Sequence, residues 1–316
     1  MNKTAKTVLK VAAGAAITYL AVGEAIYERL LNRRFTEYNN INRVVEPDIY
    51  KYYGKPEDHK EGDAWFVAVN PEDTVIVNTK GKRMHARIIK QEEYSDKWAI
   101  VIHGYTSCAR GIADQGYYFY KKGFNVIFPD LISFGEDEQK YCSMGFHDRY
   151  YIKEWINYIV EKDDNAKIAL LGVSMGSATT MLTTGEEDLP DNVRCAIADC
   201  GYTSVWEEYT SQCKKMYNIP SFPFMNAANT VSKLRGNFDF KKCAPIKAVA
   251  KSKTPTLFIH GELDEFVPYY MMDKLFNACT AEKEKLTIPD TTHADSCYTK
   301  PELYYSTVDK FVDRYI

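Results

Sequence analysis

Ser174 lies at the centre of a Gly-x-Ser-x-Gly pattern formed by residues 172–176. An apolar run of strand length, 167–171, precedes the pattern, and a segment of small residues that can begin a helix follows it. Between a strand and a helix, this pattern forms a tight turn that exposes the serine hydroxyl to a substrate carbonyl. A Cβ at either glycine would collide with neighbouring backbone in so sharp a turn. The pattern therefore predicts a nucleophilic serine.

A serine hydroxyl is a weak nucleophile at neutral pH and needs a base held beside it. His293 lies in a short loop after the last predicted strand, and Asp264 follows the predicted strand before that one. Loops at the carboxyl ends of parallel strands meet at one edge of the sheet. We expect His293 to take the proton of Ser174, and Asp264 to hold the imidazole in the required tautomer. Asp199, which ends an earlier predicted strand, is the alternative acid.

Attack by the serine leaves a negative charge on the former carbonyl oxygen, which two backbone N–H groups should stabilise. One is expected from Met175, the residue after the nucleophile. The other is expected from the loop after the strand predicted at 98–102, by position from the amide of Tyr105. Both groups belong to the main chain, so substitution of the Tyr105 side chain need not remove the second contact.

From about residue 65 the chain alternates segments typical of strands and of helices. Residues 74–77 and 84–89 flank a Lys-Gly-Lys turn and predict an antiparallel hairpin. Further apolar runs predict strands, most of them buried on both faces, at 98–102, 124–128, 168–171, 193–198, 256–259 and 285–288. Segments of helix length lie between them, such as 150–161 with one apolar face. This order predicts an α/β fold with a mostly parallel central sheet and helices on both faces.

More than fifty residues separate the strand that ends near Ala198 from the one that begins at Thr256. The segment is longer than one crossover helix and rich in aromatic residues, which predicts a small lid at about 203–250. The alternative is that these aromatic side chains fill the core of ordinary connecting helices. Within the segment, residues 220–224 are expected to form a loop.

The N-terminus combines three lysines with an uncharged apolar run from Val11 to Val22. We assign residues 1–34 to a hydrophobic anchor or signal-like helix and residues 35–316 to the main domain. The run is shorter than the roughly 20 residues of a membrane-spanning helix, although apolar residues continue the pattern beyond Glu24. An uncleaved membrane anchor is the favoured interpretation. A secreted protein cleaved near Gly23, or a cytoplasmic protein whose first helix packs on the domain, stays open.

The composition of this 316-residue chain, 45% hydrophobic and 26% charged, suits one large globular domain. A formal net charge of -3 offers no electrostatic case for nucleic-acid binding. The eight cysteines show neither a C-x-x-C pair nor zinc-ligand spacing, which favours free buried thiols over a disulfide framework, although their even number leaves export open. The absence of a dinucleotide-binding glycine motif, a P-loop or a metal-ligand cluster predicts an enzyme without a cofactor or a metal.

From about Asp73 onward the chain resembles a bacterial α/β-hydrolase of the serine aminopeptidase/BEM46-like group. The resemblance lies in the segments 103–106, 123–130, 172–176 and 260–268 and in His293. It implies the α/β-hydrolase fold with a small lid insertion, and hydrolysis of an acyl compound. One segment departs from the group, because its Arg-Gly-His-Gly-like turn is replaced by Leu-Ile-Ser-Phe-Gly at 131–135. The lost arginine leaves the substrate unspecified.

The leading hypothesis is a serine hydrolase that cleaves a carboxylic ester, a thioester or an amide through an acyl-enzyme on Ser174. Its substrate would be a small acyl compound. An aminopeptidase or acyl-peptidase acting on short peptides is the alternative, and it needs a carboxylate such as Glu207 or Glu208 for the substrate's ammonium. A binding protein without catalytic activity is a third possibility, disfavoured because all three expected catalytic residues are present in order. The oligomeric state stays open.

Overall fold

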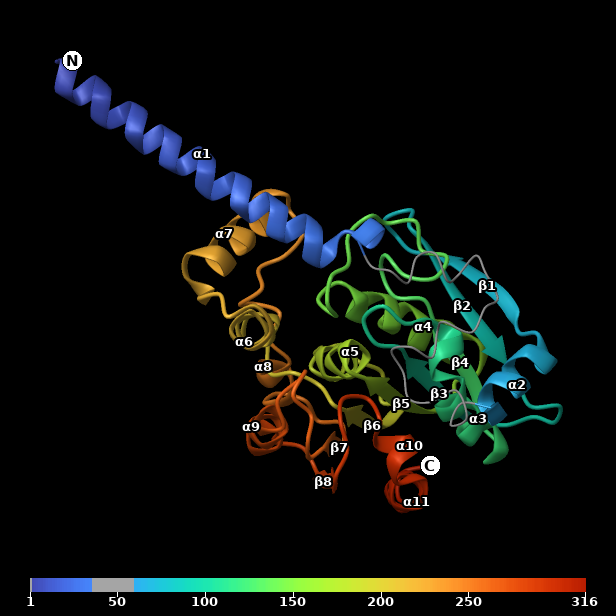
Figure 1. Ribbon diagram of the computed structural model, residues 1–316. Helices are drawn as coiled ribbons and strands as arrows, with labels where there is room; N and C mark the ends of the chain where they lie inside the picture. Colours follow the sequence, from blue (N-terminus) through green and yellow to red (C-terminus); the bar gives the residue numbers. More distant parts are fainter. Residues whose placement is uncertain (1, 36–59) are drawn as a thin grey trace.

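A computed structural model describes residues 2–35 and 60–316, so the part of the predicted main domain at 36–59 lies outside the described residues. Its centre is an eight-stranded sheet in the order β1-β2-β4-β3-β5-β6-β7-β8 (Figure 1). The strands are β1 (Glu72–Val77), β2 (Arg83–Ile89), β3 (Lys97–Ile102), β4 (Asn125–Pro129), β5 (Lys167–Val173), β6 (Val193–Asp199), β7 (Thr256–Gly261) and β8 (Lys283–Ile288).

The sheet is mostly parallel. β2 pairs antiparallel with β1, as the predicted hairpin requires, and also with β4, whereas the pairs from β4 through β8 are parallel. Every strand predicted from an apolar run is present. Because parallel strands share one direction, β3, β5, β6, β7 and β8 all present their carboxyl ends at the same edge of the sheet.

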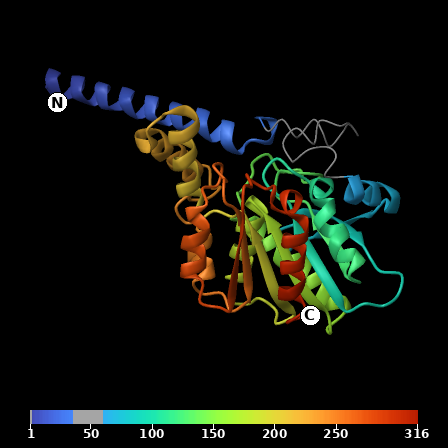
Figure 2. The same ribbon diagram turned by 60° about the horizontal axis from the view of Figure 1, so that its bottom comes forward.

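Helices cover both faces of the sheet (Figure 2). Alternate side chains of β3 belong to the two layers: Ile100 is in the same buried cluster as Trp155 of α4, whereas Val101 is in the cluster that contains Phe119 of α3 and Phe311 of α11. The helices outside the segment between β6 and β7 are α1 (Lys3–Leu31), α2 (Lys60–Val69), α3 (Ala113–Lys121), α4 (Asp148–Lys162), α5 (Met175–Thr184), α9 (Tyr270–Ala278), α10 (Ser296–Thr299) and α11 (Pro301–Val312), with short 3-10 turns at Arg33–Phe35 and Ala109–Ile112.

The long segment between β6 and β7 forms three helices, α6 (Val205–Tyr217), α7 (Ser221–Leu234) and α8 (Pro245–Val249). The loop expected at 220–224 is wrong for most of its length, because α7 begins at Ser221 and only Phe222 has non-helical backbone angles. Part of the aromatic content is core, since Tyr209 of α6 packs on Phe240. Phe222, by contrast, is 73% exposed.

Helix α1 has two different halves. Residues 2–18 are exposed along the whole helix, whereas Gly23, Tyr27 and Leu31, spaced four residues apart, are buried against the rest of the molecule. In Figures 1 and 2 the first half projects beyond the body and the second half lies beside α7. The helix is long and apolar enough to cross a membrane, by length and composition alone, as a signal sequence would also be.

Candidate active site

Ser174 lies at the turn between β5 and α5, with the backbone angles φ 56° and ψ −115°. A non-glycine residue rarely adopts a positive φ, so the surrounding structure must hold it there. The backbone N–H of Ser174 donates to the carbonyl oxygen of Asp199 at 2.9 Å, which ties the turn to the end of β6. The hydroxyl therefore stands above the carboxyl edge of the sheet, and Ser174 keeps 9% of its surface exposed.

The two glycines of the turn have no room for a side chain. A Cβ on Gly172 would lie 2.2 Å from the carbonyl oxygen of Gly176, and one on Gly176 would lie 2.0 Å from the carbonyl oxygen of Ile102. These contacts are with backbone, which cannot rotate away. The collision expected from the sequence is confirmed at both positions.

Three side chains predicted from the sequence meet at this point. The Nε2 atom of His293 lies 2.9 Å from the Oγ atom of Ser174, and its Nδ1 atom lies 2.7 Å from the Oδ2 atom of Asp264. If Nδ1 carries the proton and donates to the carboxylate, the Nε2 lone pair is free to accept the serine proton. The arrangement can therefore activate a hydroxyl for attack on a carbonyl carbon.

Asp264 is held as a carboxylate by several donors. Its Oδ1 atom accepts hydrogen bonds from the backbone N–H groups of Phe266 and Val267, at 3.0 and 2.9 Å. Burial alone would raise the pKa of Asp264, but hydrogen bonds from His260 and His293 outweigh burial and lower it. The Nε2 atom of His260 lies 2.8 Å from the Val267 carbonyl oxygen and 3.1 Å from the Oδ2 atom of Asp264, so this histidine supports the acid.

The loops that carry the acid and the base are joined to each other. The backbone N–H of Leu263 donates to the carbonyl oxygen of Thr291 at 2.9 Å. Gly261 permits this close approach, because a Cβ there would lie 2.4 Å from the same oxygen. The ring of Phe266 then packs beside the imidazole of His293, with 4.9 Å between ring centroids. Phe266 was not found from the sequence, where no spacing distinguishes it from other exposed aromatic residues.

Asp199, the alternative acid, is placed differently. Its side chain is buried and accepts a hydrogen bond from the Ser296 hydroxyl at 3.2 Å, whereas the Nδ1 atom of His293 pairs with Asp264. Burial raises the pKa of Asp199 to about 6. The geometry therefore favours Asp264 as the partner of His293, and Asp199 supports the serine turn through its main-chain carbonyl.

The loop after β3 runs beside the serine. A Cβ on Gly104 would be 3.5 Å from the Cβ of Ser174, so the backbone of residues 104–105 lies close to the nucleophile. His103 orders this loop: its Nε2 atom accepts from the Leu131 N–H at 3.1 Å, which leaves Nδ1 to donate to the Gly104 carbonyl oxygen at 2.8 Å. Burial lowers the pKa of His103 to about 4, so the ring is neutral at physiological pH.

Met175 is the first residue of α5, where backbone N–H groups have no partner within the helix and can face a ligand oxygen. The Tyr105 side chain points away from the serine, since its hydroxyl donates to the Leu30 carbonyl oxygen of α1 at 2.8 Å. The Tyr105 side chain is thus engaged away from the nucleophile.

The segment that departs from the family pattern, 131–135, supports the same loop. Phe134 packs edge-on against the rings of His103 and Tyr105, with 5.7 Å between centroids in each case. Together with the hydrogen bond from Leu131 to His103, this contact gives the segment a role in positioning the loop beside the serine. No signal in the sequence pointed to this role, because the contacts join residues about thirty positions apart.

The two glutamates considered for binding a substrate ammonium are both engaged. Glu207 pairs with the Lys274 ammonium, 2.6 Å away, and accepts from the Thr203 hydroxyl at 2.5 Å. Glu208 is 3% exposed, and burial raises its pKa to about 8, which keeps the carboxyl neutral at physiological pH. Neither side chain offers a free negative charge beside the serine.

One group of side chains in the described residues has the donor atoms of a metal site. Ligand atoms of Cys200, Asp264 and His293 lie within 4.8 Å of one another. Two of the three already share a 2.7 Å hydrogen bond, so an ion could enter only by separating His293 from Asp264. The remaining cysteines are also free thiols, and all eight are buried except Cys213, which is partly exposed.

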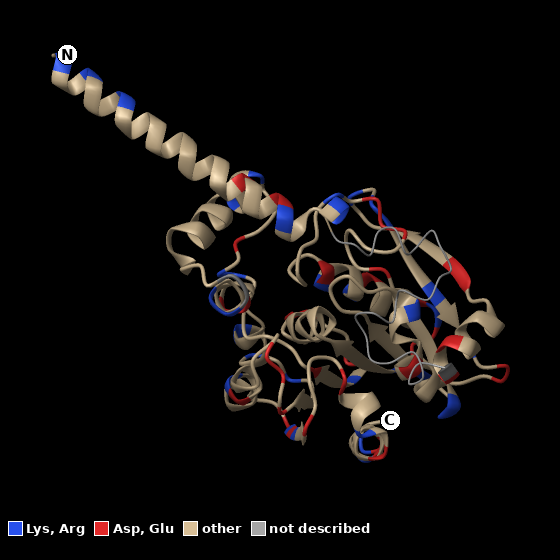
Figure 3. Cartoon of the chain, viewed as in Figure 1, with Lys and Arg blue, Asp and Glu red and all other residues tan. Residues whose placement is uncertain are grey.

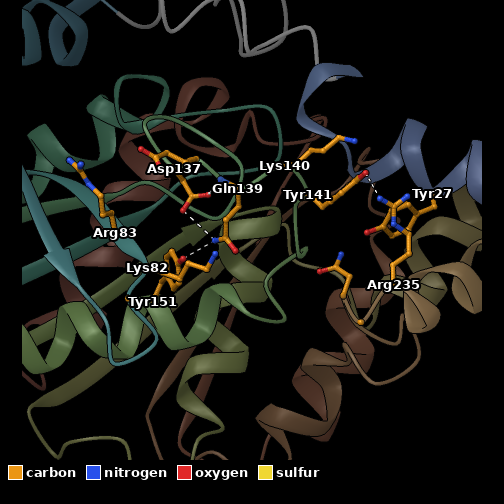
Figure 4. Close-up of a pocket in the computed structure, with 13 residues that line it drawn as sticks. Tyr27, Lys82, Arg83, Asp137, Gln139, Lys140, Tyr141, Tyr151 and Arg235 are labelled. Atoms are coloured by element: carbon orange, nitrogen blue, oxygen red, sulfur yellow. Dashed lines mark hydrogen bonds between the residues drawn. The ribbon is translucent and has the colours of Figure 1, made fainter.

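A cavity of about 620 Å³ lies away from the serine, between the end of α1 and the turn after β1 (Figure 4). Its lining includes Tyr27, Tyr141 and Arg235 on one side and Lys82 and Arg83 on the other. Arg235 donates to the Tyr141 hydroxyl across one wall. Ser174, Asp264 and His293 do not line this cavity, so the cavity is separate from the candidate active site.

Comparison with known proteins agrees with this fold. The family profile described as "alpha/beta hydrolase fold" matches residues 98–214. The YqkD protein of Bacillus subtilis is 26% identical over 215 residues, which cover 68% of this chain and 70% of that protein. The esterase Pf2001 of Pyrococcus furiosus has a similar structure, with a TM-score of 0.63 at 20% identity, covering 79% of this chain and 94% of that one.

The chain therefore has the α/β-hydrolase fold. The resemblance to the BEM46-like group is also confirmed, since the bem46 protein of Schizosaccharomyces pombe is 28% identical over 151 residues, 45% of this chain and 43% of that protein. The family profile and the relatives support a hydrolase, whereas the likeness to Pf2001, at 20% identity, shows the fold alone.

Proposed function

We propose that the protein is a serine hydrolase that cleaves a carboxylic ester of a small acyl compound through an acyl-enzyme on Ser174. The observation that carries the proposal is the continuous hydrogen-bonded series from Ser174 through His293 to Asp264. The serine has a helix N-terminus behind it and an ordered loop beside it, as the stabilisation of an oxyanion requires.

In the first half of the reaction, the Ser174 oxygen attacks the carbonyl carbon while its proton passes to His293 Nε2. The backbone N–H groups of Met175 and Tyr105 would stabilise the oxyanion. Collapse of the tetrahedral intermediate breaks the ester bond, and the proton on His293 goes to the leaving alcohol. Water then attacks the acyl-enzyme while its proton passes to His293, and that proton returns to the Ser174 oxygen as the bond to the acyl group breaks and the carboxylic acid is released.

Fluorophosphonate labelling tests the proposal. The wild-type chain should be labelled within minutes, and the Ser174→Ala and His293→Ala variants should not react above background. Ser177→Ala is a matched control, because Ser177 is buried one turn along α5 and should label normally. Labelling of Ser174→Ala at the wild-type rate would exclude Ser174 as the nucleophile.

An amide or thioester substrate remains a second form of the same chemistry, and an aminopeptidase is its nearest alternative. The paired state of Glu207 and the burial of Glu208 give no anchor for a substrate ammonium, which favours esters over peptides with a free N-terminus. A profile of p-nitrophenyl esters, measured beside aminoacyl nitroanilides, discriminates between them. Faster cleavage of the nitroanilides would overturn the ester assignment. A protein that cleaves neither class of substrate and does not react with the fluorophosphonate would be a binding protein.

A further inference from the structure

Helix α1 changes character near its middle. Its first half is apolar and fully exposed: Val8, Leu9, Val11 and Ile17 each keep more than 60% of their surface accessible. A helix of 29 residues is about 43 Å long, so the exposed half reaches well beyond the body. An isolated apolar helix of this kind has no contact in the described structure that would stabilise it in water.

The distribution of charged residues along α1 suits a helix inserted in a membrane. Lys3, Lys6 and Lys10 mark the N-terminal end, an uncharged stretch follows, and charge returns at Glu24, where the helix meets the body (Figure 3). Lysine side chains near the end of an apolar helix extend toward lipid headgroups. The occupant that fits the exposed half is therefore a lipid bilayer.

The second half of α1 packs on α7, a helix of the segment predicted to form a lid. Gly23 lies so close to α7 that a Cβ there would be 2.5 Å from the Ala227 carbonyl oxygen. On either side of this contact, the Tyr19 hydroxyl lies 3.3 Å from that of Thr230, and Arg235 pairs with both Glu24 and Glu28. Cleavage near Gly23, as in a signal peptide, would remove part of this interface.

The lid continues this connection to the catalytic residues. The side-chain amide of Gln212 in α6 donates to the carbonyl oxygen of Phe266. The Lys215 ammonium donates to the backbone carbonyl oxygen of Glu265 at 3.3 Å. Phe266 in turn packs on His293. Phe266 is 45% exposed, as is much of Leu263 beside it, so an apolar edge borders the catalytic histidine.

The lid itself exposes apolar side chains near the anchor. Phe222 and Leu234, at the two ends of α7, are more than 70% exposed, and Ile219 is exposed in the turn before α7. Because α7 packs on α1 (Figure 1), a bilayer that surrounds the first half of α1 would adjoin the N-terminal part of α7, which carries Phe222, whereas Leu234 precedes Arg235 and lies at the docked half of α1. Exposed apolar groups next to a membrane helix are typical of an interfacial surface.

We propose that α1 is a retained membrane anchor which fixes the lid at the bilayer surface, so that Ser174 receives a lipid-borne acyl ester from the membrane. This inference rests on the proposed serine hydrolase activity and adds the substrate class and its route. The freed fatty acid stays in the bilayer, and the alcohol that carried it leaves as the first product.

Two glycines of α1 provide a matched experiment. Gly23→Leu inserts a side chain where a Cβ already collides with α7, whereas Gly14→Leu adds the same side chain where nothing lies within 4 Å. Each full-length variant is mixed with phosphatidylcholine/phosphatidylglycerol vesicles that carry p-nitrophenyl palmitate. Cleavage of this ester is compared with cleavage of p-nitrophenyl acetate in solution and with fluorophosphonate labelling.

Both variants should float with the vesicles, label normally and cleave the soluble acetate within about threefold of wild type. Gly23→Leu should cleave the embedded palmitate about tenfold more slowly than wild type, since the docked lid no longer holds the site at the surface, and Gly14→Leu should match wild type. Equal cleavage of the palmitate by the two variants would overturn the inference.

Other outcomes are equally decisive. A wild-type protein that cleaves neither ester and does not label refutes the proposed function itself. A wild-type protein that is active on the acetate but does not float, or whose mass shows loss of the first 23 residues, refutes the anchor alone. Membrane association in cells without flotation on pure lipid would assign the exposed helix to a partner protein. If Gly23→Leu does not fold, Arg235→Ala removes the pairs with Glu24 and Glu28 without adding volume, and should slow cleavage of the palmitate alone.

Discussion

Replacing Asp264 by asparagine tests the assignment of the acid most sharply. The Oδ1 atom of Asp264 is fixed by the N–H groups of Phe266 and Val267, which an asparagine carbonyl oxygen can also accept. The new NH2 group must then take the place of Oδ2, 2.7 Å from His293 Nδ1. An NH2 group there donates to Nδ1 and drives the ring proton to Nε2.

The imidazole of Asp264→Asn would thus present a proton to Ser174 where the reaction needs a lone pair. The carboxylate that stabilises the imidazolium is lost in the same change. A triad with this tautomer error loses roughly 10⁴-fold in kcat, which corresponds to about 5 kcal/mol of transition-state stabilisation. The same NH2 group also faces Nε2 of His260, 3.1 Å from the present oxygen, so a modest loss of stability should accompany the loss of activity.

The assay is the rate of p-nitrophenyl butyrate cleavage, with the fluorophosphonate labelling rate as a second readout and thermal unfolding as a check on the fold. Asp199→Asn is the control, because that side chain is equally buried but hydrogen-bonded to Ser296 rather than to His293. It should keep activity within about tenfold of wild type. The reasoning would be wrong if Asp264→Asn kept more than a hundredth of the activity, or if Asp199→Asn lost as much.

Two further predictions concern stability. Gly176→Ala should lower the free energy of unfolding by about 3 kcal/mol, because its Cβ would lie 2.0 Å from a backbone oxygen. Gly14→Ala should leave the midpoint of urea unfolding unchanged, since nothing lies within 4 Å of its Cβ. Equal midpoints for the two variants would contradict the collision. Glu208 has a pKa raised to about 8 by burial, so the folded protein retains a proton that the unfolded chain releases above about pH 4.5, and stability falls as pH rises toward 8. The free energy of unfolding of Glu208→Gln, relative to that of wild type, should therefore rise by about 4 kcal/mol between pH 4.5 and pH 8. A difference in urea unfolding that stays constant across that range would disprove the burial argument.

The sheet was predictable because its strands are local signals. A strand buried on both faces, such as β5, must be apolar at every position, and that run can be recognised without any knowledge of its neighbours. The serine turn was predictable because its signal is also a short one: a Cβ on Gly172 would collide within the turn, and a Cβ on Gly176 would collide with Ile102 of the neighbouring strand β3. The pattern of two glycines around a serine can be recognised without knowing that the second contact is with β3.

The attachment of α1 could not be predicted in the same way. Its buried positions, Gly23, Tyr27 and Leu31, follow a spacing of four residues, but the uniformly apolar sequence before them hides where the docked half begins. Gly23 contacts α7, about two hundred residues away in the chain, whereas Tyr27 packs on Tyr141 and the carbonyl oxygen of Leu31 accepts from the N–H of Cys142. A membrane anchor and a packed helix were treated as alternatives, whereas α1 has an exposed apolar half and a docked half.

The acid shows most clearly what the sequence leaves undecided. Asp199 and Asp264 both follow buried strands that are neighbours in the sheet, so strand order alone gives either one access to the histidine. What separates them is the hydrogen bond from Leu263 to Thr291, which joins the loop of Asp264 to the loop of His293. Asp199 instead directs its carbonyl oxygen to the N–H of Ser174 and its carboxyl to Ser296. Asp199 therefore lies one strand from the catalytic position and supports the nucleophile through its backbone. The hydrogen bond between the two loops, which no local sequence pattern encodes, selects Asp264 as the carboxylate that reaches the imidazole.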